Sequence, residues 1–172
     1  MPPRIERYSQ PVLDTVLNGS IKAAEKSDIP TTIAEAKNAY FQRNYGEAVP
    51  LFRQIAGIEE LQDHRIEAAN AYHMLSNCLY FMGHTDDLKE ANEAIQKAIE
   101  FYPASEEFTG LRTSAVIVQL TILSGLANQT GNPDYFNQGV KVCEQNIDLL
   151  RNGQEVQKEL ILKGFMKKSD SL

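Results

Sequence analysis

Residues 36–55, AKNAYFQRNYGEAVPLFRQI, contain the pattern that decides the fold. Apolar residues recur every three or four positions before and after Asn44-Tyr45-Gly46, and this spacing is typical of amphipathic helices. Pro50 is compatible with the second helix, because a proline is tolerated in the first turn of a helix. The stretch therefore predicts two helices joined by a tight turn.

The same pattern of helical stretches and short turns extends along the whole chain of 172 residues. No segment shows the sustained alternation of apolar and polar residues that marks a half-buried strand. We expect a first helix at about 9–27, hairpins at about 29–59, 66–103 and 107–151, and a last helix at about 154–168. The expected boundaries are turn or stop signals: Ser27-Asp28, Gly57, Gly83, Tyr102-Pro103, Gly131-Asn132-Pro133 and Asn152-Gly153. The prediction is an all-α chain of about eight helices, in which sequential helices are antiparallel neighbours.

Helical hairpins that recur at a near-constant interval indicate a solenoid. The second hairpin has the fullest pattern of large and small residues: Tyr72, Leu75, Ser76, Leu79, Gly83, Ala91, Ile95, Ala98 and Pro103. The first keeps Ala36, Ala39, Tyr45, Ala48, Phe52 and Ile55, and the degenerate third keeps Leu120, Leu123, Ser124, Ala127, Gly131, Phe136, Gly139 and Cys143. By these residues the chain resembles the tetratricopeptide repeat (TPR) family, with an insertion around His84-Thr85-Asp86.

The resemblance implies one TPR-like domain over 1–172, a solenoid of helical hairpins coiled into a right-handed superhelix. The helices that flank the repeats would then act as polar-faced caps. Small residues at Ala36, Ser76 and Ser124 would let the two helices of each hairpin approach closely. The family also has a concave groove, lined by the first helix of each repeat.

The groove positions of the family fall on three sets of residues in this sequence: Pro30, Ile33, Lys37, Tyr40 and Phe41; Asn70, His73, Asn77, Tyr80 and Phe81; and Val118, Thr121, Gly125, Asn128 and Gln129. The candidate peptide-binding residues among them are Lys37, Tyr40, Phe41, Asn70, His73, Asn77, Tyr80, Phe81 and Asn128. The two Tyr-Phe pairs could form aromatic platforms for a peptide side chain, with the asparagines bonding the peptide backbone. Alternatively, one aromatic ring of each pair packs against the neighbouring hairpin.

The carboxylate clamp of the co-chaperone branch of the family is not expected. That clamp needs cations, and this sequence has Ile33, Val118 and Ile122 where they belong. A carboxylate held there would be poorly neutralised.

Charge is unevenly distributed along the chain, whose formal net charge is -6. Between residues 59 and 107 there are eleven acidic and three basic residues, which leaves the remainder of the chain slightly positive. The acidic stretch is either a solvated outer face or a docking surface for a basic partner. The overall negative charge disfavours nucleic acids and anionic membranes as partners.

No pattern for catalysis, metal binding or a cofactor is present, so we expect no enzyme activity, no metal and no cofactor. His64, His73 and His84 lack helical metal-ligand spacing, and the sequence has no HExxH, GxSxG or glycine-rich phosphate loop. Cys78 and Cys143 have no CxxC spacing and are expected to be small buried hydrophobes. Residues 1–17 contain charges where a signal peptide needs an apolar core, and no uninterrupted apolar run reaches about 18 residues. A cytoplasmic location is the expectation.

The leading hypothesis is a noncatalytic adaptor, scaffold or assembly factor that binds a peptide or helix of another protein. An alternative is a small acidic secretion-type chaperone that holds an unfolded client segment. A third is self-assembly, since the helix expected at about 108–130 is more apolar than one hairpin can bury. Either the C-terminal helix or another subunit would then cover it.

Overall fold

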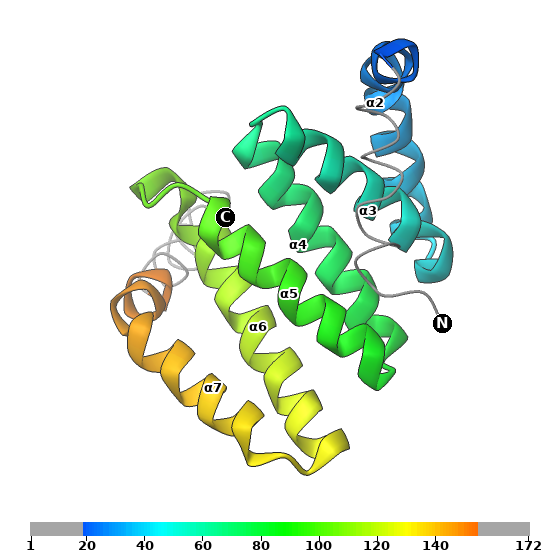
Figure 1. The fold of residues 1–172 in the computed structure, drawn as a ribbon. Coiled ribbons are helices and arrows are strands. Elements are labelled where there is room, and N and C mark those ends of the chain that lie inside the picture. Colours follow the sequence, from blue (N-terminus) through cyan, green and yellow to red (C-terminus); the bar gives the residue numbers. More distant parts are fainter. Residues whose placement is uncertain (1–18, 155–172) are drawn as a thin grey trace, which may run out of the picture. The chain divides into compact units, whose positions relative to one another are not determined.

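The computed structural model describes the backbone of residues 19–154 and the side chains of residues 28–154. This part of the chain is helical and contains no β-strand, which confirms the all-α prediction (Figure 1). It divides between Tyr102 and Pro103 into two compact units. Residues 9–18 of the helix expected at about 9–27 lie outside the described residues, as do residues 155–168 of the helix expected at about 154–168.

The described part of the first unit, residues 19–102, contains four helices, α2 (Gly19–Phe41), α3 (Tyr45–Leu61), α4 (Arg65–Met82) and α5 (Thr85–Phe101). Each helix packs against the next one along the chain, α2 on α3, α3 on α4 and α4 on α5. The loops between them have only two or three residues, so consecutive helices run antiparallel, and α2 and α4 point in the same direction.

The turn between α2 and α3 lies at residues 42–44, earlier than the expected turn at Asn44-Tyr45-Gly46. Arg43 adopts a left-handed conformation with φ of 60°, and the N–H of Asn44 donates to the carbonyl of Ala39. Asp63 adopts the same left-handed conformation, with φ of 59°, in the turn that follows α3. The helix α3 continues through Gly57 and ends at Leu61. These turns use non-glycine residues in the left-handed region, so glycine was a misleading guide to where α3 begins and ends.

The helix α2 is continuous from Gly19 to Phe41, so the break expected at Ser27-Asp28 is wrong. Pro30 lies inside this helix and removes one backbone donor. The hydroxyl of Thr32 donates to the carbonyl of Asp28 at 3.1 Å, which supplies a side-chain donor beside the proline. The helix therefore passes through a position where its sequence predicts an end.

The second unit contains the 3-10 helix η1 (Glu106–Phe108) and the helices α6 (Thr109–Thr130) and α7 (Pro133–Gln145), and helical backbone resumes at 147–154. Seven helices thus have both ends within residues 19–154, where the prediction for the chain is about eight. As expected, α6 ends at Gly131, with φ of 68°. The Asn132 side chain caps α7 by accepting from the N–H of Asp134.

The expected break at Asn152-Gly153 does not occur, because Gly153 is a packing contact and not a stop signal. A Cβ atom placed on Gly153 would lie 2.5 Å from the Thr113 side chain of α6. The hydroxyl of Thr113 donates to the Leu149 carbonyl at 3.4 Å on the same stretch. The glycine permits the helix at 147–154 to approach α6 closely.

Some of the apolar residues of α6 are buried and others are exposed. Val116, Ile122, Leu123 and Leu126 are buried, whereas Leu111 and Ile117 are 41% and 49% exposed. The segment Glu106–Thr130 is long and apolar enough to cross a membrane, a test that core helices of soluble proteins also pass. Ser124 is exposed, so the expectation that it lies between the two helices of the third hairpin is wrong.

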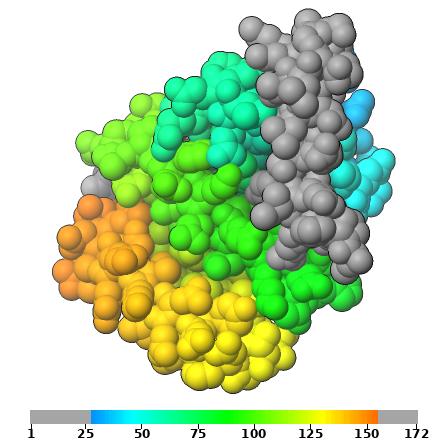
Figure 2. Space-filling view, viewed as in Figure 1, coloured from blue at the N-terminus to red at the C-terminus, as the bar shows by residue number. Residues whose placement is uncertain are grey.

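Two ion pairs link α3 to α5, the helices whose cyan-to-teal and green atoms adjoin in Figure 2. Arg53 of α3 pairs with Glu90 of α5 at 2.9 Å, and both side chains are largely buried. Lys97 of α5 pairs with Glu60 of α3 at 2.9 Å in a more exposed position. Both pairs tie the second helix of one hairpin to the second helix of the next.

The cysteines differ in their surroundings. Cys78 is fully buried, and burial raises the pKa of its thiol to about 12. Cys143 is exposed on α7, so the expectation that it is buried is wrong. No residue of α7 is buried, so the apolar character of a cysteine in this helix does not lead to burial.

Candidate functional site

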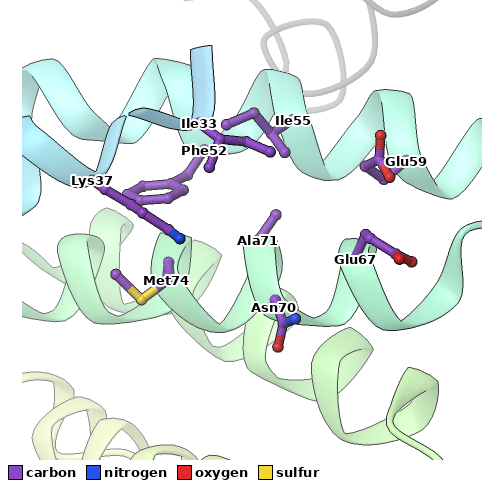
Figure 3. Close-up of a pocket in the computed structure, with 9 residues that line it drawn as sticks. All are labelled: Ile33, Lys37, Phe52, Ile55, Glu59, Glu67, Asn70, Ala71 and Met74. Carbon is purple, nitrogen blue, oxygen red and sulfur yellow. The ribbon is translucent and has the colours of Figure 1, made fainter. Parts of the chain in front are cut away.

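A pocket of about 160 Å³ lies among α2, α3 and α4, and we call it the α2–α4 pocket. Its lining is Ile33, Lys37, Phe52, Ile55, Glu59, Glu67, Asn70, Ala71 and Met74 (Figure 3). Phe52, Ile55 and Ala71 are buried and form an apolar floor, and the half-buried Ile33 and Met74 flank it. An apolar cavity of about 150 Å³ holds a molecule the size of benzene, so this pocket can hold one large apolar side chain.

The two ends of the α2–α4 pocket carry opposite charges. Figure 3 shows Lys37 at one end and Glu59 and Glu67 at the other, with the apolar residues between them. Lys37 and Glu67 are exposed, whereas Glu59 is buried and its carboxylate lies 3.1 Å from Nδ1 of His64. The exposed amide of Asn70 adds a polar group to the rim.

Five aromatic residues gather at the C-terminal ends of α2 and α4 and at the start of α3, and we call them the aromatic cluster: Tyr40, Phe41, Tyr45, Tyr80 and Phe81. Tyr45 and Phe81 stack with ring centroids 4.8 Å apart, and Tyr45 also meets the edge of Tyr40 at 5.9 Å. Tyr45 therefore joins the two Tyr-Phe pairs of the sequence into one surface.

The rings of the aromatic cluster differ in exposure. Phe41 is 77% exposed and Phe81 53%, whereas Tyr40 is half-buried. Burial raises the pKa of Tyr40, and a hydrogen bond with the Asn77 side chain opposes this shift. Large exposed apolar groups of this kind mark surfaces that bind other molecules.

Behind the pocket rim, hydrogen bonds connect three polar side chains, those of His73, Tyr102 and Asn70. The Tyr102 hydroxyl donates to Oδ1 of Asn70 at 3.0 Å and lies 3.1 Å from Nδ1 of His73. Burial lowers the pKa of His73 to about 4 and raises that of Tyr102 to about 12, so both are neutral at pH 7. The hydrogen bond from Tyr102 therefore holds the Asn70 side chain in position at the rim.

The structure separates the nine candidate residues into four places. Lys37 and Asn70 line the pocket; Tyr40, Phe41, Tyr80 and Phe81 form most of the aromatic cluster, and Asn77 bonds Tyr40 beside it. His73 is buried against Tyr102, and Asn128 is exposed on α6 in the second unit.

Sequence reasoning missed the acidic end and the floor of the pocket. Phe52 and Ile55 were recognised only as repeat positions that pack between helices, and Ala71 and Met74 were not singled out. One signal could have pointed to them. A small residue, Ala71, lies on α4 opposite the large Phe52 of α3, and a small residue facing large ones can leave space.

The second unit has a wider polar depression lined by residues of η1, α6 and the 145–152 stretch. The Nε atom of Arg112 is buried there and has no hydrogen-bond partner among the described residues. The lining is mostly polar and lacks an apolar floor, so it is less suited than the α2–α4 pocket to hold an apolar group.

The described residues include no group of three or more His, Cys, Asp or Glu side chains placed to hold a metal ion. Comparison with known proteins gives no further assignment: no family model matches the chain, and no curated protein or solved structure matches it either.

Proposed function

We propose that this protein is a noncatalytic protein-binding module, a TPR-like solenoid acting as an adaptor or assembly factor. Its ligand is a peptide or helix of another protein, which inserts an apolar side chain into the α2–α4 pocket. The observation that carries the proposal is the pocket itself, an open apolar space of about 160 Å³ bounded by α2 and α4, the first helices of two successive hairpins.

The chemistry of the pocket supports a protein ligand. Burying one leucine or phenylalanine side chain contributes about 1.5–3 kcal/mol, and the floor of Phe52, Ile55 and Ala71 is already shielded from water. The exposed rings of Phe41 and Phe81 lie at the ends of the same two helices and offer further apolar area. Interface cores combine aromatic anchors and an apolar pocket in this way.

Filling the pocket is expected to abolish binding without unfolding the chain. In the Ala71→Leu variant, a branched side chain occupies the space, and leucine is as compatible with a helix as most residues. Peptides selected from a random phage-displayed library on the wild type should lose affinity at least tenfold, as measured by fluorescence polarisation.

Ala71→Ser is the matched control, because it keeps the space open. If Ala71→Leu proves unstable by circular dichroism, Ile33→Glu tests the same wall of the pocket from a half-buried position. Selected peptides that bind Ala71→Leu and wild type equally well would refute the proposed site. Binding that depends on the pocket but not on peptide sequence would favour the chaperone alternative.

Self-assembly is a second candidate, favoured by one specific observation on α7. Phe136 and Val140 are 67% and 41% exposed, and Cys143 is exposed as well. The three residues are four and three positions apart, a spacing that places them on one face of α7. If this stripe joins copies of the chain, light scattering should show a dimer or larger species that Phe136→Ser dissociates. A strict monomer at high concentration would remove this candidate.

A further inference from the structure

The charges at the ends of the α2–α4 pocket have a defined spacing along its axis. Glu67 precedes Ala71 by one helical turn on α4, and Lys37 follows Ile33 by one helical turn on the parallel helix α2. At a rise of about 1.5 Å per residue, Glu67 is offset from Ala71, and Lys37 from Ile33, by roughly 6 Å along the helix axis. An extended peptide covers that distance in about two residues.

Both charged groups are available to a ligand. Lys37 and Glu67 are exposed, and neither belongs to the ion pairs of the described part of the chain. Glu59 reinforces the negative end, although its carboxylate also contacts the half-exposed imidazole of His64. Alternate residues of an extended peptide point to the same side, so an apolar side chain and its second neighbours would face the pocket together.

Resting on the proposed function, we propose that the α2–α4 pocket recognises a partner segment with one large apolar residue flanked, two positions away on either side, by opposite charges. The basic residue of the segment pairs with Glu67, and its acidic residue pairs with Lys37. The two walls of the pocket differ, α2 and α3 on one side and α4 on the other, so the segment lies in one direction and the order of its two charges is fixed. An exposed pair contributes a factor of about two to five in affinity, so the charges select the partner while the apolar residue anchors it.

The test is a parallel selection from one random phage-displayed peptide library on two purified full-length proteins. One is the wild type and the other is the double variant Lys37→Glu with Glu67→Lys, which exchanges the charges at the two ends. We expect wild-type peptides to share an apolar residue between a basic and an acidic residue, each two positions away. Peptides selected on the double variant should carry the same pattern with the two charges in the opposite order.

Cross-binding of the selected peptides then measures the effect. Each peptide family should bind its own protein about fivefold or more tighter than the other protein, and raising the ionic strength should reduce the difference. The matched control is the double variant Glu35→Lys with Lys89→Glu, which exchanges charges at exposed positions outside the pocket lining and should leave the wild-type preference unchanged.

The outcomes separate this inference from the proposed function. Peptides that lose binding in Ala71→Leu but show no charge pattern, or the same pattern on both proteins, would refute the inference and leave the function standing. The absence of any peptide that depends on the pocket would overturn both. A dimer of the wild type that Ala71→Leu dissociates would assign the pocket to a second copy of the chain and also overturn the inference.

Discussion

Replacing Arg53 by methionine is expected to lower the free energy of unfolding by about 3–5 kcal/mol, because it leaves a carboxylate buried without its partner. Arg53 donates from Nε to Oε2 of Glu90 at 3.0 Å and from Nη2 to Oε1 at 3.2 Å. The Glu90 side chain is only 6% exposed, so water cannot replace the lost donors. The effect is large because the desolvation of the remaining charge is no longer offset.

The double variant Arg53→Met with Glu90→Leu should recover most of that loss. Replacing both members of a buried ion pair with apolar residues is often neutral or stabilising. The wild type, the two single variants and the double variant form a double-mutant cycle, and urea denaturation at pH 7 followed by circular dichroism gives their four free energies of unfolding.

Lys97→Met provides the matched control, because Lys97 and Glu60 link the same two helices while being 41% and 33% exposed. In addition, the Tyr72 hydroxyl still donates to the Glu60 carboxylate when Lys97 is absent. A loss below about 1 kcal/mol is expected there. If Arg53→Met also costs less than 1 kcal/mol, the Arg53–Glu90 pair behaves like a surface pair and our account of it is wrong.

The helical content and several helix ends could be predicted from local sequence. Gly83 and Gly131 end α4 and α6 with φ of 77° and 68°, the left-handed conformation that glycine adopts without strain. The end of α5 before Pro103 also agrees with the prediction. Each of these signals acts within a few residues, so the sequence alone carries it.

Other features depend on contacts between distant residues, and local patterns could not reveal them. Arg53 and Glu90 are 37 residues apart, and each alone resembles an ordinary surface charge on an amphipathic helix. Gly153 resembles a helix breaker, yet its role is set by Thr113 on another helix. The left-handed turns at Arg43 and Asp63 likewise lack glycine, the residue that usually marks this conformation in a sequence.

The candidate site was predictable only in part for the same reason. Lys37 and Asn70, two of the candidates taken from the repeat pattern, line the α2–α4 pocket, and their role in binding stays a prediction. The repeat pattern could not show that Tyr45 bridges the two Tyr-Phe pairs, or that Glu59 and Glu67 gather opposite Lys37. Those features require the positions of α2, α3 and α4 relative to one another.

Acidification is expected to destabilise the protein through His73. Burial lowers the pKa of this histidine from 6.5 to about 4, so the folded state binds fewer protons than the unfolded state between these values. The free energy of unfolding therefore falls as the pH falls from about 6.5 to 4, by up to about 3 kcal/mol from this group. Above pH 6.5 the histidine is neutral in both states, and its contribution no longer changes.

The group responsible can be isolated with His73→Gln. Its amide can still donate to the Tyr102 hydroxyl, which lies 3.1 Å from Nδ1 of His73, but it does not titrate. The variant should have a flatter dependence of unfolding free energy on pH between 6.5 and 4.5, even if it is less stable at pH 7. His84→Gln is the matched control, because the His84 side chain is 82% exposed and its removal should leave the slope close to that of the wild type. Urea denaturation at several pH values measures both, and equal slopes for His73→Gln and the wild type would show that another group causes the acid sensitivity.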